Sequence, residues 1–82
     1  MAETAEARLA AIRDHCDRGI RYYAWALKRM PSIPEQVDTI PQVESAMYAH
    51  AIVLAYVEGA KSERDALWAA GQITQLQGSS RG

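Results

Sequence analysis

Twelve consecutive residues in the middle of the chain, from Ala46 to Val57, carry no formal charge. Apolar and weakly polar residues recur there at steps of three and four, which is the period of a helix and not of a strand. One stripe of this helix consists of Val43, Ala46, Met47, His50, Val53, Leu54 and Val57, and its other side carries Tyr48, Ile52, Ala55 and Tyr56. A helix that is apolar on most sides needs cover on most sides, so this segment predicts the centre of a helical bundle.

The rest of the chain also favours helix. It has no Phe, alanine recurs throughout, and no Asn-Gly or Asp-Gly hairpin signal is present. We predict an all-α fold, a helical hairpin plus a third helix, with helices over residues 4–30, 39–58 and 62–77. Residues 1–78 form one domain in this prediction, and 79–82 form a disordered tail.

Breaking and capping residues set these boundaries. Pro31 ends the first helix because the residue before a proline is displaced from helical geometry. Gly59 is a natural left-handed stop for the second helix, although one glycine does not forbid a helix that continues through it. The expected caps are Ser32 with Glu35 for a short turn in the connector, Thr39 with Gln42, and Ser62 with Asp65, and Gly78 is the expected last stop.

The first and third helices each carry an apolar stripe that predicts a face toward the core. The first stripe is Leu9, Ile12, Cys16, Gly19, Tyr23, Ala26 and Met30, widened by Ile20 and Leu27. The third is thinner: Ala66, Ala69, Ala70, Ile73 and Leu76. Gly71 in the third helix is a candidate for close helix approach. Trp68 lies off its stripe, and we expect it either to close the end of the bundle or to join the outer contact surface.

One rich stripe and one alanine-rich stripe leave part of the second helix without cover. We therefore expect a second copy of the chain to complete the core in a homodimer, through Met47, His50, Leu54 and Tyr56. In an antiparallel dimer the two His50 rings would face each other and respond to pH. The alternative is a compact monomer whose tyrosines are half exposed.

Catalytic motifs are absent from the sequence. It has no glycine-rich phosphate loop, no Gly-x-Ser-x-Gly and no His-Glu-x-x-His, and its acids form no paired site. Cys16 is expected to be a small buried apolar residue, with His15 about 100° away around the helix. His50 is expected to be a core-edge histidine with one hydrogen bond. We predict no enzyme activity, no cofactor and no metal.

Charge placement is the feature that points to a function. Helix one holds six basic residues, whereas residues 31–60 hold four acids and no basic residue, so the net charge of -1 conceals a segregation. Six residues of helix one fall within about 120° of a helical wheel, opposite the apolar stripe. They are Arg18, Arg21, Tyr22, Trp25, Lys28 and Arg29, and we call them the basic-aromatic face.

Tryptophan, tyrosine and arginine are the residues that carry binding energy at protein interfaces. We predict a non-catalytic module that binds a macromolecular partner through this face, with Trp25 as the apolar anchor and the arginines bonded to carboxylates. A nucleic acid or another anionic ligand on the same face is a second interpretation. The third is a purely structural homo-oligomer, in which Asp14–Arg18 and Asp17–Arg21 are solvated helix pairs.

The remaining expectations come from composition. A single cysteine excludes a disulfide framework, no apolar run is long enough for a membrane span, and the opening residues lack a signal peptide, so we expect a cytoplasmic protein. The segment from Arg8 to Arg13 is similar to the start of many small helical proteins of phages and mobile elements. That resemblance implies an accessory protein that inhibits host machinery, as anti-CRISPR proteins do.

Overall fold

The computed structural model describes residues 4–79, with side chains described as far as residue 75. Its elements are α1 (Ala5–Arg29), the short 3-10 helices η1 (Met30–Ser32) and η2 (Pro34–Thr39), α2 (Ile40–Val57) and α3 (Glu63–Ser79). Residues 4–79 contain no strand. The prediction of an all-α fold with three main helices and a long first helix is confirmed.

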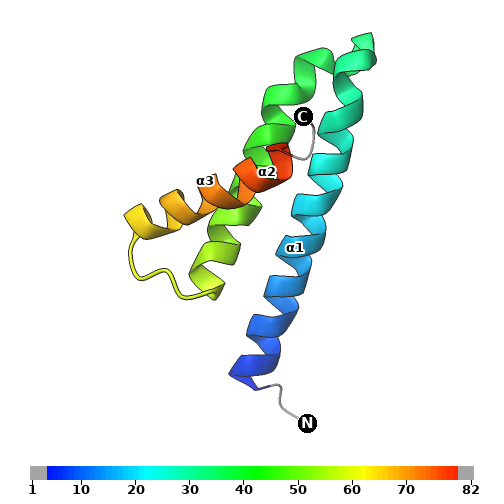
Figure 1. Ribbon diagram of the computed structural model, residues 1–82. Helices are drawn as coiled ribbons and strands as arrows, with labels where there is room; N and C mark the ends of the chain where they lie inside the picture. The colour runs from blue at the N-terminus through cyan, green and yellow to red at the C-terminus, as the bar shows by residue number, and fades with distance from the viewer. Residues whose placement is uncertain (1–3, 80–82) are drawn as a thin grey trace.

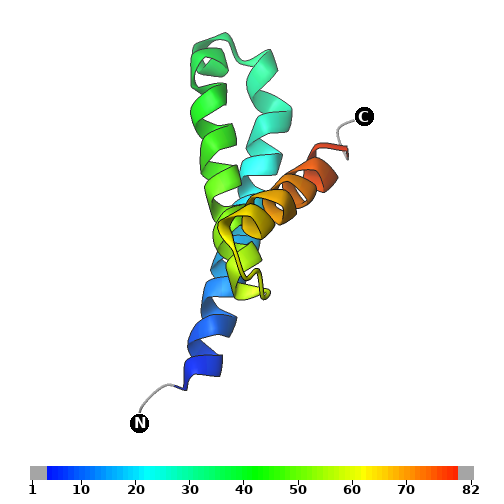
Figure 2. The ribbon, with the colours of Figure 1, turned by 90° about the vertical axis from the view of Figure 1, so that its left-hand side faces the viewer.

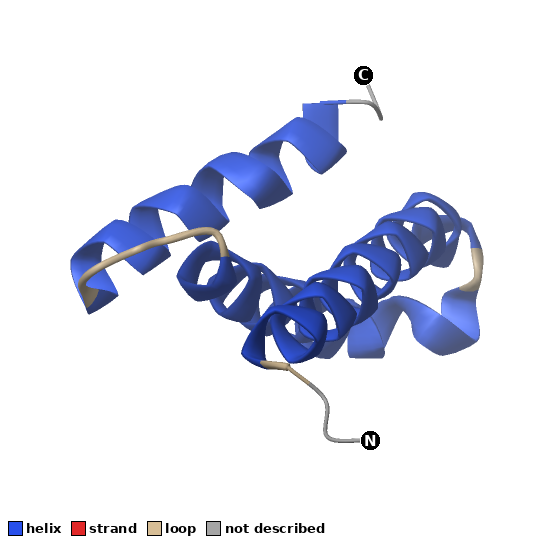
Figure 3. Ribbon diagram, turned by 90° about the horizontal axis from the view of Figure 1, so that it is seen from below, coloured by secondary structure: helices blue, strands red, loops and turns tan. Residues whose placement is uncertain are grey.

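The helices α1 and α2 lie side by side as an antiparallel hairpin, and η1 and η2 form its closed end (Figure 1). Helix α3 crosses α2 obliquely instead of running along the hairpin (Figure 2), and it packs mainly against α2. Figure 3 shows α3 on one side of α2, with α1 on another. The N-terminal part of α1 projects beyond the end of α2 (Figure 1). The molecule is therefore elongated, with extents of 48 × 31 × 20 Å.

The core lies between the three helices and contains many small residues. Its buried members are Cys16, Ile20, Ala24, Leu27, Met30, Met47, Ala51, Leu54, Ala55, Ala66 and Ala70. Alanines at these positions let the helix axes approach closely, so α3 covers α2 with little side-chain volume. The predicted alanine-rich contact of α3 is confirmed at Ala66 and Ala70, and the side chain of Leu76 lies outside the described residues.

This core corrects part of the predicted self-association surface. Met47 and Leu54 are buried within the single chain, since α1 and α3 together enclose that side of α2. They therefore present no surface to a second copy. Tyr56 is exposed and His50 is half-buried.

The apolar stripe of α1 is also buried over only part of its predicted length. Cys16 and Met30 lie in the core, and Tyr23 and Ala26 pack against it. Leu9 and Ile12 are exposed: the N-terminal part of α1 projects past the end of α2, and Ile12 lies in an open hollow beside Ala49 and Val53 of α2. The prediction identified the correct face of α1, but that face is not buried over its first two turns.

Two of the predicted signals for helix ends, the cap at Ser62 and the stop at Gly59, are confirmed, and α1 has a cap at Thr4 that was not predicted. Thr4 Oγ1 accepts a hydrogen bond from the Ala7 amide at 3.0 Å and caps α1. Ser62 Oγ accepts one from the Asp65 amide at 3.1 Å and caps α3. Gly59 has a φ of 115°, a conformation that L side chains rarely adopt, so α2 ends there and does not continue through the glycine.

The predicted caps at Thr39 and Ser32 and the predicted stop at Gly78 are wrong. Helix α1 does end just before Pro31, as predicted, but Met30 keeps helical angles, with φ -58° and ψ -37°, because the chain continues there as η1. Thr39 and Ser32 cap no amide; their hydroxyls donate to the carbonyls of Gln36 and Arg29, respectively, at 2.8 Å. Gly78 does not stop α3, which continues through it to Ser79, and the remainder of the predicted tail lies outside the described residues. Gly71 marks no close helix approach, since a Cβ built there has no atom within 4 Å.

Candidate protein interface

All six residues of the basic-aromatic face lie on the solvent side of α1. Tyr22 is 62% exposed and Trp25 is 51% exposed, which is unusual for such large aromatic side chains. The predicted outward direction of the face is therefore correct. Burial of Trp25 among aliphatic residues of its own chain would have excluded a recognition role, and no such burial occurs.

Trp25 is held in place by its neighbours on α1. The guanidinium carbon of Arg29 lies 4.1 Å from the centre of the indole ring, and Arg29 Nη1 donates a hydrogen bond to the Trp25 carbonyl at 3.1 Å. The Tyr22 ring also stacks on the indole, at a centroid distance of 6.2 Å and an interplanar angle of 25°. The three side chains form an ordered aromatic platform, so a partner would not need to order them on binding.

The cations of the face fall into two groups. Arg18 pairs with Asp14 at 2.8 Å and Arg21 pairs with Asp17 at 3.0 Å, as the sequence spacing predicts. Lys28 and Arg29 have no carboxylate within ion-pair distance in the part of the chain that the structure describes. The positive charge that is free for a partner is thus concentrated near the C-terminal end of α1.

A hollow of about 460 Å³ opens beside Trp25, between α1, the connector and the start of α2. We call it the Trp25 hollow. Its lining residues are Tyr22, Tyr23, Trp25, Ala26, Arg29, Met30, Ile33, Gln36, Thr39 and Val43. The connector side of this hollow was missed at the sequence level. Pro31 and Pro34 indicate that the chain turns in the connector, but they do not specify the directions of the Ile33 and Gln36 side chains.

His50 joins α2 to α1 at the middle of the hairpin. Its Nδ1 lies 2.8 Å from the Ala46 carbonyl oxygen, and a carbonyl only accepts, so Nδ1 carries the proton of this bond. The ring makes an edge contact with Tyr23 at 5.3 Å and faces His15 at 5.6 Å. The prediction of a core-edge histidine with one hydrogen bond is confirmed. The facing of two His50 rings in a dimer stays a prediction.

Cys16 is buried in the core of the hairpin, as predicted. Burial raises the pKa of its thiol, because the thiolate is poorly solvated there. Within the described residues no group of three or more metal-ligating side chains occurs.

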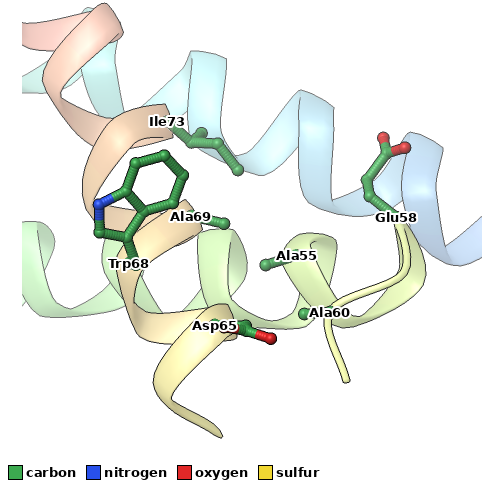
Figure 4. A pocket seen from close by; sticks show the side chains of 7 residues that line it. All are labelled: Ala55, Glu58, Ala60, Asp65, Trp68, Ala69 and Ile73. Atoms are coloured by element: carbon green, nitrogen blue, oxygen red, sulfur yellow. The ribbon is translucent and has the colours of Figure 1, made fainter. Parts of the chain in front are cut away.

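Another hollow, of about 390 Å³, lies between α2 and α3 (Figure 4). Trp68 stands at one side of it beside Ile73 and Ala69 (Figure 4). Of the two carboxylates that line it, Asp65 also belongs to α3, whereas Glu58 follows the end of α2. Glu58 also pairs with Arg13 at 3.4 Å. Trp68 is strongly exposed, so it does not close the end of the bundle, one of the two roles expected for it.

No family model matches the chain, and no similar protein was found among the curated proteins or the solved structures. The resemblance to phage-borne accessory proteins stays a prediction. In the described part of the chain, each helix is too short or too polar to cross a bilayer.

Proposed function

We propose that this chain is a non-catalytic module that binds another protein through the basic-aromatic face of α1. The observation that carries the proposal is the exposed platform of Trp25, Tyr22 and Arg29 beside a hollow of about 460 Å³. An exposed tryptophan held against an arginine supplies a large apolar contact area together with directional hydrogen bonds. Interface hot spots have this composition.

The charge distribution supports a protein over a nucleic acid as the partner. Arg18 and Arg21 are paired with aspartates, so only Lys28 and Arg29 of the face are free to bind phosphates. Nucleic-acid binders neutralise several phosphates at once and present a continuous basic surface. Two free cations beside a mostly apolar hollow fit a partner with apolar side chains and one or two carboxylates.

The test is capture from a native lysate treated with nuclease, with wild-type protein and two variants as bait. Trp25→Ala removes the anchor, and Trp68→Ala is the matched control because it removes an exposed tryptophan from a different helix. We expect a discrete protein that wild type and Trp68→Ala capture and that Trp25→Ala loses. Capture of the same proteins by all three baits, or capture abolished by nuclease, contradicts the proposal.

A further inference from the structure

A second hollow, of about 470 Å³, lies on the same flank of the hairpin as the Trp25 hollow. We call it the Ile12 hollow. It lies between α1 and α2, with Ala11, Ile12 and His15 on one side and Ala49 and Val53 on the other. No α3 residue lines either hollow. Helix α3 therefore covers one flank of α2 and leaves this flank of the hairpin open.

A run of aromatic rings joins the two hollows. From the Trp25 hollow toward the Ile12 hollow, successive centroids are 6.2 Å apart for Trp25 and Tyr22, 5.6 Å for Tyr22 and Tyr23, 5.3 Å for Tyr23 and His50, and 5.6 Å for His50 and His15. The two hollows are separate, with these rings between them, and together they make up one face of the hairpin, which we call the hairpin groove. Gly19 lies under its middle, beneath the His50 ring.

The dimensions and walls of the hairpin groove suit a helix. From Ile12 to Trp25 the α1 wall extends about 20 Å, the length of about 13 helical residues. Both walls are helices whose backbone groups are already bonded internally, so an extended peptide would find no strand edge to pair with. A helix satisfies its own backbone and needs only apolar contacts from the groove.

The charge around the groove selects the kind of helix. Neither hollow is lined by a carboxylate, and Arg29 is the one charged residue among the residues that line them. Arg8 lies one turn before Ile12 at the other end, and α2 contributes no charge between Ala46 and Val57. We infer that the segment bound here is an amphipathic helix with an apolar stripe and acidic residues along its edges. This inference rests on the proposed function and extends it along the hairpin.

The same charges disfavour a second copy of the chain in the groove. A two-fold dimer brings the same surface of both copies together. Antiparallel packing would then place the Arg8 end of one copy against the Arg29 end of the other, with no lining carboxylate to offset the repulsion. An acidic helix meets the same arginines with opposite charge.

The test uses two synthetic helical peptides of about 14 residues, with capped ends and leucines at i, i+3, i+4 and i+7. One carries glutamates on its flanks and the other carries lysines. The protein has Trp68→Phe, which leaves Trp25 as its only tryptophan, so that Trp25 fluorescence reports binding. We expect the glutamate peptide to bind at least about tenfold more tightly than the lysine peptide. Equal binding of the two, or no binding of either, overturns the inference.

A matched pair of variants on α2 locates the binding. Val53 is 45% exposed and lines the groove, whereas Tyr56 is 47% exposed and does not line it. Val53→Glu should lower the affinity for the glutamate peptide about tenfold or more, and Tyr56→Glu should change that affinity less than about twofold. Equal effects of the two substitutions overturn the inference. Ala49→Glu, on the same wall, replaces Val53→Glu if circular dichroism shows that the latter unfolds.

Two further results separate this inference from the proposed function. If the protein captured from lysate is lost with Trp25→Ala but kept with Val53→Glu, the basic-aromatic face binds it and the groove does not. If Trp25→Ala keeps it, the proposed function itself fails. The second result comes from sedimentation of the free protein. If wild type is a dimer and Val53→Glu is a monomer, a second copy of the chain occupies the groove, and the inference is overturned.

Discussion

The imidazole of His50 lies directly against the backbone of Gly19. A Cβ built on Gly19 would stand 2.7 Å from Cδ2 and 3.1 Å from Nε2 of that ring. Real Cβ contacts are almost never that short, so the ring takes the space that any other residue at position 19 would fill. This contact fixes how closely α1 and α2 approach at the middle of the hairpin.

Gly19→Ala is therefore expected to destabilise the protein. The substitution gains about 1 kcal/mol of helix propensity, but overpacking against a ring that is already hydrogen-bonded costs about 1–3 kcal/mol. We expect a net loss of about 1 kcal/mol in the free energy of unfolding, measured by urea denaturation.

Gly71→Ala is the control for this prediction, because its Cβ meets nothing within 4 Å. It should gain about 0.5–1 kcal/mol from helix propensity alone. Adding His50→Ala to Gly19→Ala should remove the overpacking and recover part of the loss. If Gly19→Ala is as stabilising as Gly71→Ala, the close contact is absent in solution.

Ile20 and Ile12 test where the apolar stripe of α1 is buried. Ile20 is 2% exposed in the core, and Ile12 is 41% exposed in the hollow beside Val53. Ile20→Ala should cost about 2–5 kcal/mol through lost burial and the cavity left behind. Ile12→Ala should cost less than about 1 kcal/mol, and both losses can be read from chemical denaturation. Similar losses for the two variants would mean that the N-terminal half of α1 is covered in solution.

Cys16 should react slowly with thiol reagents in the folded protein. Its raised pKa lowers the fraction of reactive thiolate at neutral pH, and burial blocks access to the sulfur. Alkylation should be about tenfold or more slower in the native state than in concentrated urea, and it should speed up as pH rises. Native and unfolded rates that agree at one pH would exclude a buried thiol.

Ser62 and Thr39 are predicted to differ as helix caps although their sequence contexts are similar. Ser62 accepts the Asp65 amide, so Ser62→Ala should lose about 1 kcal/mol of stability. Thr39 accepts no amide at the start of α2, so Thr39→Ala should lose clearly less. Thermal unfolding of the two single variants makes the comparison, and a larger loss for Thr39→Ala would contradict the assignment of caps.

The sequence predicted the number and type of elements because the signals for them are local. Gly59 adopts a positive φ, Ser62 is followed by Asp65 at capping distance, and the uncharged segment 46–57 is periodic. It did not predict that Leu9 and Ile12 are exposed. Their exposure depends on where α2 ends relative to α1, and no periodicity along one helix contains that information.

The candidate site was predictable in part for the same reason. The outward direction of Trp25 follows from helical spacing, and so do the ion pairs of Arg18 and Arg21. The hollow beside Trp25 requires the path of the connector, and the contact of His50 with Gly19 requires the register of two helices. These relationships between distant segments arise from packing and leave no local signal.

The two lysines in the chain provide the most direct test of the proposed interface. Lys28 belongs to the basic-aromatic face, and Lys61 lies between α2 and α3. An amine-reactive photo-crosslinker is attached to Lys61→Arg protein, which keeps Lys28, and to Lys28→Arg protein, which keeps Lys61. After irradiation in native lysate, we predict a discrete crosslinked protein with the first and not with the second. Equal crosslinking of both, or crosslinking through Lys61 alone, would contradict an interface on this face of α1.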